Sequence, residues 1–152
     1  MTEGEKMRGY SCIALDNPKY DVNVGSALRA AYNYRAAMIC ASGMRYKRHA
    51  ADTSKAYRHM PLLCVEDVFD CIPFDCVPVG VDLVPDAKNL CTYRHPERAF
   101  YIFGAEDATL GQRILSRCKE VVAVPTDGCM NLAASVNVVL YDRLSKQMRK
   151  AQ

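Results

Sequence analysis

The most constraining feature of the sequence is a short apolar run that ends in a proline and leads through a turn into a long apolar segment. Residues 121–124 are rich in valine, as expected of a buried strand that is covered on both faces. Pro125 removes a backbone donor and ends the strand, and Asp127 with Gly128 is typical of a turn. A helix is predicted from Asn131 almost to the end of the chain. Backbone N–H groups at such a strand tip and helix start suit a ligand, although an ordinary strand-turn-helix connection has the same pattern.

The rest of the chain alternates between predicted strands and predicted helices. Strands are predicted at residues 10–15, 36–41, 76–81 and 98–103, and helices at 23–34, 62–70 and 106–118, whereas 85–96 is expected to be irregular. Asn23 is a plausible N-cap of its helix. This alternation indicates an α/β fold with a mainly parallel sheet covered by helices on both faces. We expect a single domain over residues 1–152, because the chain is long enough for one full core and contains no linker.

Composition narrows the class of protein. Half of the 152 residues are apolar, so disorder is not expected. No apolar run approaches the roughly 20 residues that span a bilayer, and the polar N-terminus lacks the apolar part of a signal peptide; a cytoplasmic protein is therefore expected. The eight cysteines are scattered without a C-x-x-C pair, and the three histidines have no metal-binding spacing with them. Reduced thiols and no metal site are predicted.

Positive charge is concentrated in one long loop, residues 42–61. This loop contains five cationic residues and one acidic residue, Asp52, whereas the net charge of the rest of the chain is close to zero. The cationic residues are Arg45, Lys47, Arg48, Lys55 and Arg58. Tyrosine and histidine rings alternate with them, and rings of this kind stack on unpaired bases while cations contact phosphates. We predict that this loop binds RNA, and a solvated charge run is the alternative.

Common nucleotide-binding and hydrolase motifs are absent from the sequence. It contains no G-x-x-x-x-G-K-[ST], no G-x-G-x-x-G after the first strand, no G-x-S-x-G and no H-E-x-x-H. A P-loop, a dinucleotide-type fold and the common Rossmann-like methyltransferases are therefore unsupported.

Three segments taken together resemble the SpoU/TrmH branch of the SPOUT RNA methyltransferases. They are Asn23 to Arg29 (N-x-G-x-x-x-R), Phe103 to Leu110 (F-G-x-E-x-x-x-L) and Val124-Pro125 with Cys129-Met130-Asn131. The resemblance extends from Gly9 to Arg143, and it is the order and separation of the three segments that make it specific. It implies a deep trefoil knot at the C-terminal part of the fold, whose loops hold S-adenosylmethionine in a bent shape.

The resemblance also implies roles for single residues. Cofactor contacts are implied for Gly80, Phe103, Gly104, Val124, Cys129 and Met130. Arg29 is implied to orient the ribose hydroxyl that accepts the methyl group, because a guanidinium is always protonated and is a poor base. The catalytic set is completed by Asn23, Glu106 and Asn131, which can hold Arg29 and the motif loops in place. Three positions depart from the family pattern, namely Thr109, Cys129 and Ala133.

The predicted function is S-adenosylmethionine-dependent methylation of an RNA ribose 2′-hydroxyl. Transfer RNA is favoured over ribosomal RNA, because the chain lacks the additional N-terminal RNA-binding domain of many relatives that act on ribosomal RNA. A non-catalytic RNA-binding protein that keeps the knot, and a SPOUT enzyme that methylates a base, are the alternatives. The final helix has apolar residues on a second side, at Val138 and Tyr141, and a helix with two apolar sides needs two partners; a homodimer is therefore expected.

Overall fold

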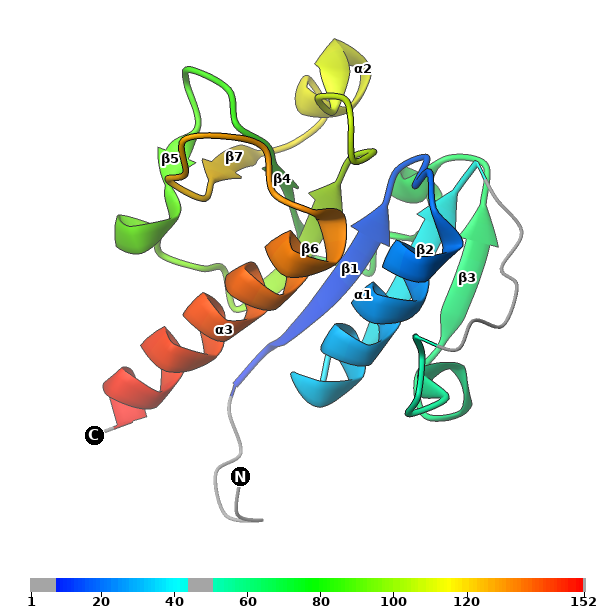
Figure 1. Ribbon diagram of the computed structural model, residues 1–152. Coiled ribbons are helices and arrows are strands. Elements are labelled where there is room, and N and C mark those ends of the chain that lie inside the picture. Colours follow the sequence, from blue (N-terminus) through cyan, green and yellow to red (C-terminus); the bar gives the residue numbers. More distant parts are fainter. Residues whose placement is uncertain (1–7, 44–50, 152) are drawn as a thin grey trace.

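The computed structural model describes residues 8–43 and 51–151, and in this part of the chain seven strands form one sheet (Figure 1). The strands are β1 (Tyr10–Leu15), β2 (Met38–Ser42), β3 (Leu62–Val65), β4 (Val77–Val81), β5 (Lys88–Asn89), β6 (Arg98–Phe103) and β7 (Glu120–Ala123). Their order across the sheet is β3-β2-β1-β6-β4-β7-β5, and every neighbouring pair is parallel. All carboxyl ends of the strands therefore meet at one edge of the sheet.

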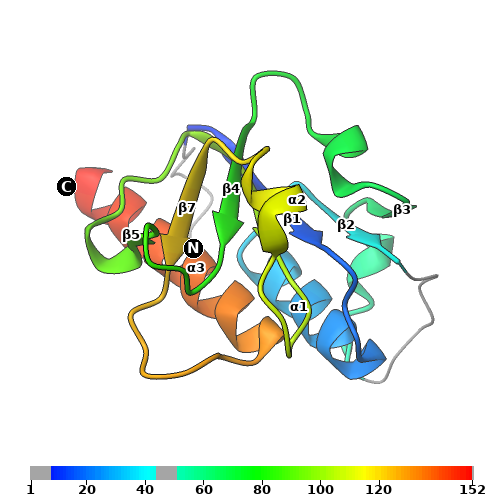
Figure 2. The same cartoon turned by 90° about the horizontal axis from the view of Figure 1, so that it is seen from above.

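Helical segments cover both faces of this sheet. The helices α1 (Asp21–Asn33) and α3 (Leu132–Ala151) lie side by side on one face (Figure 2). Beneath them, Ile13 and Leu15 of β1 belong to one core cluster, whereas Cys12 and Ala14 belong to a second cluster with residues of α2 (Gly111–Leu115) and η2 (Val68–Cys71). Successive strand residues point to opposite faces, so each strand contributes to both cores. The predicted parallel sheet covered on both faces is confirmed, and the trefoil knot stays a prediction.

The prediction of a helix over residues 62–70 is wrong. Residues 62–65 instead form the edge strand β3, which pairs with β2, and the 3₁₀ turn η2 follows. The carbonyl oxygen of Pro61 accepts a hydrogen bond from the backbone N–H of Ile39 at 3.0 Å. Pairing with β2 therefore decides the conformation, because a short apolar run fits a strand and a buried helix equally well.

The helix predicted over residues 106–118 is confirmed only for the five residues of α2. Gly111 has φ +71°, which is a left-handed conformation that a helix cannot continue through. Upstream, the backbone N–H of Leu110 donates to Oδ2 of Asp82 at 2.8 Å instead of to a helical carbonyl. Residues 104–110 are consequently a loop at the carboxyl edge of the sheet.

The predicted capping role of Asn23 is also wrong. The helix α1 begins two residues earlier, at Asp21, and Asn23 is buried within its first turn. The start predicted for the final helix is correct, because Asn131 immediately precedes α3. Its Oδ1 accepts hydrogen bonds from the backbone N–H groups of Ala133 and Ala134 at 2.9 and 3.2 Å, as an N-cap side chain does.

Regular structure is sparse in two long connections, from β2 to β3 and from β4 to β6. In its described part, the first contains the 3₁₀ turn η1 (Ala56–Arg58). The second, predicted to be irregular, contains β5 and the 3₁₀ turn η3 (Leu90–Thr92).

All eight cysteines are described and are free thiols. In the described residues, no cluster of three or more His, Cys, Asp or Glu side chains is arranged for a metal ion. No helix in that part of the chain has the length and apolar character needed to cross a membrane.

Candidate active site

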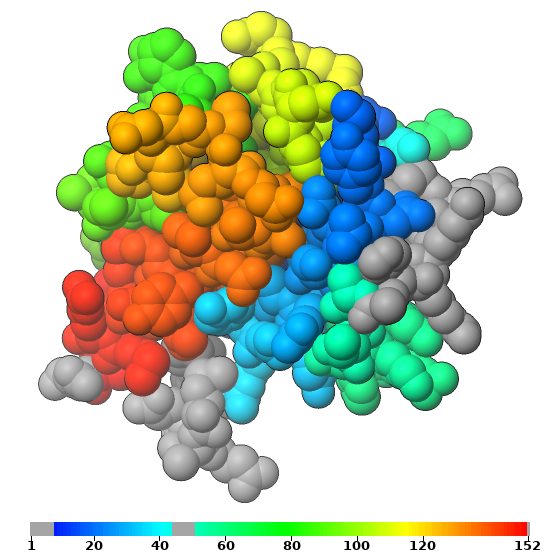
Figure 3. Space-filling model, in the orientation of Figure 1, coloured from blue at the N-terminus to red at the C-terminus, as the bar shows by residue number. Residues whose placement is uncertain are grey.

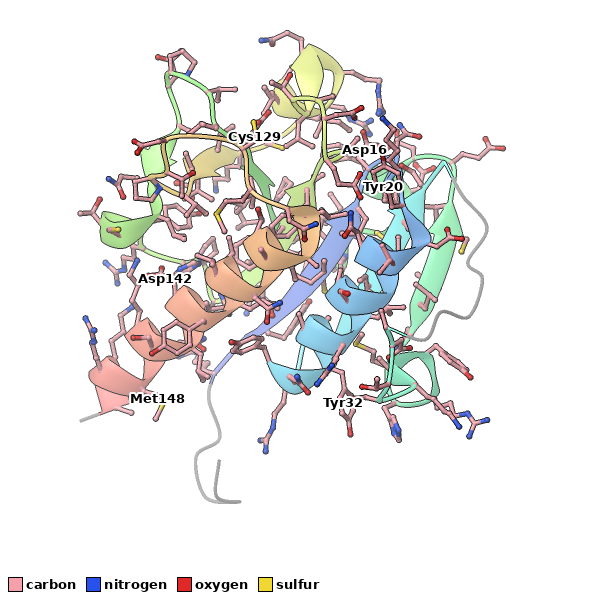
Figure 4. The ribbon with its side chains drawn as sticks, in the orientation of Figure 1. Asp16, Tyr20, Tyr32, Cys129, Asp142 and Met148 are labelled. Carbon is pink, nitrogen blue, oxygen red and sulfur yellow. The ribbon has the colours of Figure 1, made fainter. Side chains whose placement is uncertain are left out.

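A surface hollow lies at the carboxyl edge of the sheet, where β4, β6 and β7 end. Loops after these three strands and the first turn of α3 form its walls; the lining residues are Val81, Asp82, Leu83, Phe103, Gly104, Ala105, Glu106, Ala108, Leu110, Val124, Thr126, Gly128, Cys129, Met130, Leu132 and Ser135. In Figure 4, Cys129 marks this end of the molecule, on the turn that follows β7. Ligands of open parallel sheets bind at this edge.

Five of the six residues predicted to contact a cofactor line this hollow, and Gly80 does not. A Cβ at Gly80 would lie 3.2 Å from Sγ of Cys118 and 3.3 Å from Cδ1 of Leu110. The glycine therefore lets the α2 segment pack closely on β4, and a contact between Gly80 and a cofactor stays a prediction. Gly104 lines the hollow, but its missing side chain faces Leu110, 3.3 Å from the Cβ position. Close packing of Leu110 thus accounts for glycine at position 104.

Three of the four predicted catalytic residues meet in one chain of hydrogen bonds. Nδ2 of Asn131 donates to Oδ1 of Asn23 at 2.9 Å, and Nδ2 of Asn23 donates to Oε1 of Glu106 at 2.6 Å. The residues belong to the start of α3, to α1 and to the loop after β6, and are far apart in sequence. The chain of bonds, which we call the Asn131–Asn23–Glu106 chain, therefore fixes the three motif segments relative to one another.

The ionised carboxylate of Glu106 determines the direction of this chain. An ionised carboxylate only accepts hydrogen bonds, so the amide NH₂ of Asn23 must face it. The oxygen of Asn23 then faces the NH₂ of Asn131, whose own oxygen caps α3. Oε2 of Glu106 also accepts the backbone N–H of Lys19 at 3.0 Å. Burial alone raises the pKa of Glu106, but hydrogen bonds from Asn23 and from backbone N–H groups outweigh it and hold the pKa below its ordinary value.

The fourth predicted catalytic residue, Arg29, lies outside the hollow. It is exposed on α1, and within the described residues it forms no ion pair. It lies six positions after Asn23, which is about 9 Å along the helix axis and about 120° around it. The fold thus brings Asn23, Glu106 and Asn131 together but leaves the guanidinium free to meet a ligand from outside.

The predicted RNA-binding cations are only partly within the described residues. Arg45, Lys47 and Arg48 lie outside them. Lys55 and Arg58 are exposed at η1, and the guanidinium of Arg58 lies 6.0 Å from the ring centroid of Tyr57. RNA binding by this loop stays a prediction.

The sequence interpretation missed two aspartates at the carboxyl edge of the sheet, Asp82 and Asp16. Asp82 lines the hollow and fixes the loop at Leu110, as described above. Asp16 is buried at the end of β1; its carboxylate accepts Oγ–H of Ser42 at 2.9 Å and Nη2 of Arg113 at 2.8 Å. Both aspartates directly follow a strand that ends at this edge, and that position was a signal that could have identified them.

Comparison with known proteins identifies the family. The model of the SpoU rRNA Methylase family matches residues 10–141, which include all three motif segments. The chain belongs to the SpoU rRNA Methylase family. A search of curated protein sequences found no match. The family assignment therefore rests on the family model, and solved structures agree with it in fold.

Among solved structures, the fold is similar to that of the SpoU methyltransferase AviRb from Streptomyces viridochromogenes, with 18% identity and a TM-score of 0.81 over 94% of this chain and 62% of AviRb. AviRb has also been solved in complex with the cofactor AdoMet. The TrmH/SpoU tRNA modifying enzyme of A. aeolicus has 16% identity and a TM-score of 0.84, over 97% of this chain and 80% of that enzyme. A protein studied for the 2-OH methylation of C/U34 on tRNA has 18% identity and a TM-score of 0.75, over 93% and 92% of the two chains. This chain therefore spans about three fifths of the length of AviRb and most of the length of the other two.

Proposed function

We propose that this chain is an S-adenosylmethionine-dependent RNA methyltransferase that acts on a ribose 2′-hydroxyl, with transfer RNA as the favoured substrate. The observation that carries the proposal is the Asn131–Asn23–Glu106 chain, because it joins the three segments that define the family resemblance at the edge of one hollow. Membership of the SpoU rRNA Methylase family and the cofactor complex of AviRb support the choice of cofactor.

The residues of the hollow suit an adenosyl cofactor. Its walls combine apolar side chains such as Val124, Met130 and Leu132, which fit a purine ring, with backbone groups of three loops and the polar side chains of Asp82 and Ser135. When bound, the cofactor supplies an electrophilic methyl group on a sulfonium. The Asn131–Asn23–Glu106 chain then holds the loops that form the hollow, so that the position of the reacting centre is set before RNA arrives.

Arg29 is proposed to orient the ribose hydroxyl and its neighbouring phosphate. The planar guanidinium donates paired hydrogen bonds that match a phosphate. Its charge would stabilise the negative charge that develops on the oxygen when the hydroxyl proton passes to solvent water and the methyl group moves from the sulfonium, which is left as a neutral thioether. Its exposure allows this role, because within the described part of the chain no carboxylate competes for it. The departures at Cys129 and Ala133 leave the hydrogen-bonded chain intact, since Ala133 contributes a backbone N–H to Asn131.

A homodimer is the proposed assembly. The outer sides of α1 and α3 form one continuous face of the molecule (Figure 3). Three exposed aromatic residues belong to or adjoin these helices: Tyr20 just before α1, Tyr32 near its end and Tyr141 in α3 are 52%, 39% and 61% exposed. Exposed aromatic side chains are enriched at protein interfaces. Arg29 lies on the same pair of helices, so a second copy on this face would lie beside the proposed catalytic guanidinium.

Methyl transfer to defined RNAs tests the proposed function. The protein is incubated with S-adenosylmethionine carrying a labelled methyl group and, in separate reactions, with unmodified transfer RNA and ribosomal RNA. Label in the transfer RNA, absent when the protein is omitted, is the expected result. Label confined to ribosomal RNA would contradict the substrate preference. Cofactor binding without transfer to either RNA would instead favour a non-catalytic RNA-binding protein.

A further inference from the structure

A second hollow lies at the opposite end of α3 from the candidate active site. Its volume is about 660 Å³, and its walls are formed by residues 92–97, by the last turns of α3 and by Arg8. In Figure 4, Met148 lies at this end of α3, whereas Cys129 lies on the turn that precedes the other end. The first turn of α3 lines one hollow and its last residue lines the other. About 28 Å of helix separates these ends, at 1.5 Å per residue.

Two of the cations that line this second hollow have structural roles. Arg143 is only 5% exposed and donates hydrogen bonds to the carbonyl oxygens of Pro96 and Glu97, at 2.5 and 2.6 Å. Lys146 donates to the carbonyl oxygen of Tyr93 at 3.0 Å and to Oδ2 of Asp142 at 2.6 Å. These bonds join α3 to the segment before β6, so the base of the hollow is a fixed part of the fold.

Three other cations lie at the hollow without a structural partner. Arg94, Arg149 and Lys150 line it and are exposed, and within the described residues none of them forms an ion pair. Glu97 is the one acid among the lining residues, and it already pairs with Arg8 at 3.3 Å. The hollow is therefore strongly positive, and we call it the basic hollow.

Helix-dipole complementation explains only part of this charge. Cations in the last turn of a helix are stabilised by its C-terminal carbonyls, and that argument covers Arg149 and Lys150. It does not cover Arg94, which comes from the connection after η3. Cations from two elements, arranged around a cavity with few acids, are the electrostatic signature of a surface that meets an anionic polymer.

We propose that the basic hollow binds phosphates of the same RNA whose ribose reaches the candidate active site. This inference rests on the proposed function and narrows its substrate class. Since the two hollows lie at opposite ends of α3, the RNA must be long or folded enough to reach from one to the other. A short oligonucleotide can occupy only one of them, so the substrate is a structured RNA and not a short single strand.

Salt-dependent binding of unfractionated transfer RNA tests the inference. The variant is Arg149→Ala/Lys150→Ala. If each side chain contacts a phosphate, the log–log dependence of affinity on salt should become less steep by about 1.4 to 1.8. The loss of affinity relative to the parent protein should then be roughly tenfold larger at 50 mM than at 200 mM salt. Affinity for S-adenosylmethionine should stay unchanged.

Two control proteins make the result specific. Arg149→Lys/Lys150→Arg keeps both charges and should bind like the parent. Lys119→Ala removes an exposed charge between α2 and β7 that is not among the residues lining the basic hollow, and should have little effect. Equal salt dependence in parent and double-alanine variant would overturn the inference. A changed oligomeric state of that variant in light scattering would overturn it in favour of a protein interface. Normal binding with no methyl transfer would contradict the proposed function and leave the inference standing.

Discussion

At the scale of single residues, the candidate site depends on one carboxylate. Glu106 accepts hydrogen bonds through both oxygens, from the side chain of Asn23 and from the backbone of Lys19. Because it only accepts, it gives Asn23 and Asn131 a single orientation. A side chain at position 106 that has a donor in place of one of the two carboxylate oxygens should therefore disturb α1, the loop after β6 and the start of α3 together.

Replacing Glu106 by glutamine tests this dependence. The glutamine oxygen can accept from Asn23, but its NH₂ then meets the backbone N–H of Lys19, and two donors face each other. We expect Glu106→Gln to lower the free energy of unfolding by about 1 kcal/mol and to weaken S-adenosylmethionine binding, measured by calorimetry. Asp107→Asn is the matched control, since Asp107 is exposed and, among the described side chains, its ion-pair partner is Lys19 alone. Equal losses in the two variants would contradict the special role of Glu106.

Arg29 should behave in the opposite way. Its side chain is exposed and supports no described part of the fold, so Arg29→Ala should leave thermal stability nearly unchanged, as for most surface substitutions. Cofactor binding should also persist. Methyl transfer should fall by orders of magnitude, because orientation and charge stabilisation of the hydroxyl are lost. Arg29→Lys keeps the charge without the planar donors and should recover only part of the activity. Wild-type turnover of Arg29→Ala would remove this residue from the mechanism.

At the scale of elements, some segments could be predicted from the sequence and others could not. The bounds of β1 and β6 agree with the prediction, because continuous apolar runs between polar loops leave little choice. Residues 62–65 form a strand because they pair with the edge of β2, and only the tertiary structure contains that information. The α2 region was predicted too long because the carboxylate of Asp82, 28 positions away, binds the backbone N–H of Leu110.

The same distinction applies to the candidate site. The motif residues meet because the carboxyl ends of parallel strands share one edge of the sheet. The predicted α/β fold already implies that shared edge. The individual hydrogen bonds depend on side-chain positions that cannot be predicted from the spacing of apolar residues in the sequence. Arg113 binding Asp16 is such a case, since a salt bridge between residues 97 positions apart leaves no local pattern in the sequence.

The outer face of α1 and α3 gives a prediction at this scale. If a second copy covers it, Tyr141→Asp should place a charge in a buried interface and shift the protein from dimer to monomer in light scattering at micromolar concentration. Phe74→Asp is the control, because Phe74 is 96% exposed on the turn before β4, away from these helices. A parent protein that is monomeric, or the same shift in both variants, would contradict the proposed dimer face.

At the scale of the whole molecule, stability should depend on pH through His95. Burial lowers the pKa of His95 to about 4, while the hydrogen bond with Asp142 works in the opposite direction. In the unfolded chain the imidazole has a pKa near 6.5. As pH falls from about 6.5 to about 4, His95 therefore takes up a proton in the unfolded chain but stays neutral in the folded protein. The free energy of unfolding decreases over this range. The expected loss is about 3 kcal/mol.

The variant His95→Gln should remove this dependence. Glutamine can keep one hydrogen bond to Tyr101 or Asp142 but does not titrate. The free energy of unfolding of the variant protein should therefore vary much less than that of the parent between pH 6.5 and 4.5. Urea unfolding across that range measures both proteins. Below about pH 4.5 both should lose stability, because Glu106 and Glu120 then take up protons in the unfolded chain, whereas the fold holds their pKa values below the ordinary value. Parallel curves for parent and variant would show that folding does not lower the pKa of His95.

The position of the transferred methyl group is the most direct test of the central claim. Transfer RNA methylated by the protein with labelled S-adenosylmethionine is hydrolysed with alkali, and the products are identified by mass spectrometry. A methyl group on the ribose 2′-oxygen blocks cleavage of the adjacent phosphodiester, so the label is expected in alkali-resistant dinucleotides. Label on the base of ordinary mononucleotides would contradict the ribose assignment, and RNA without label would contradict the proposed activity.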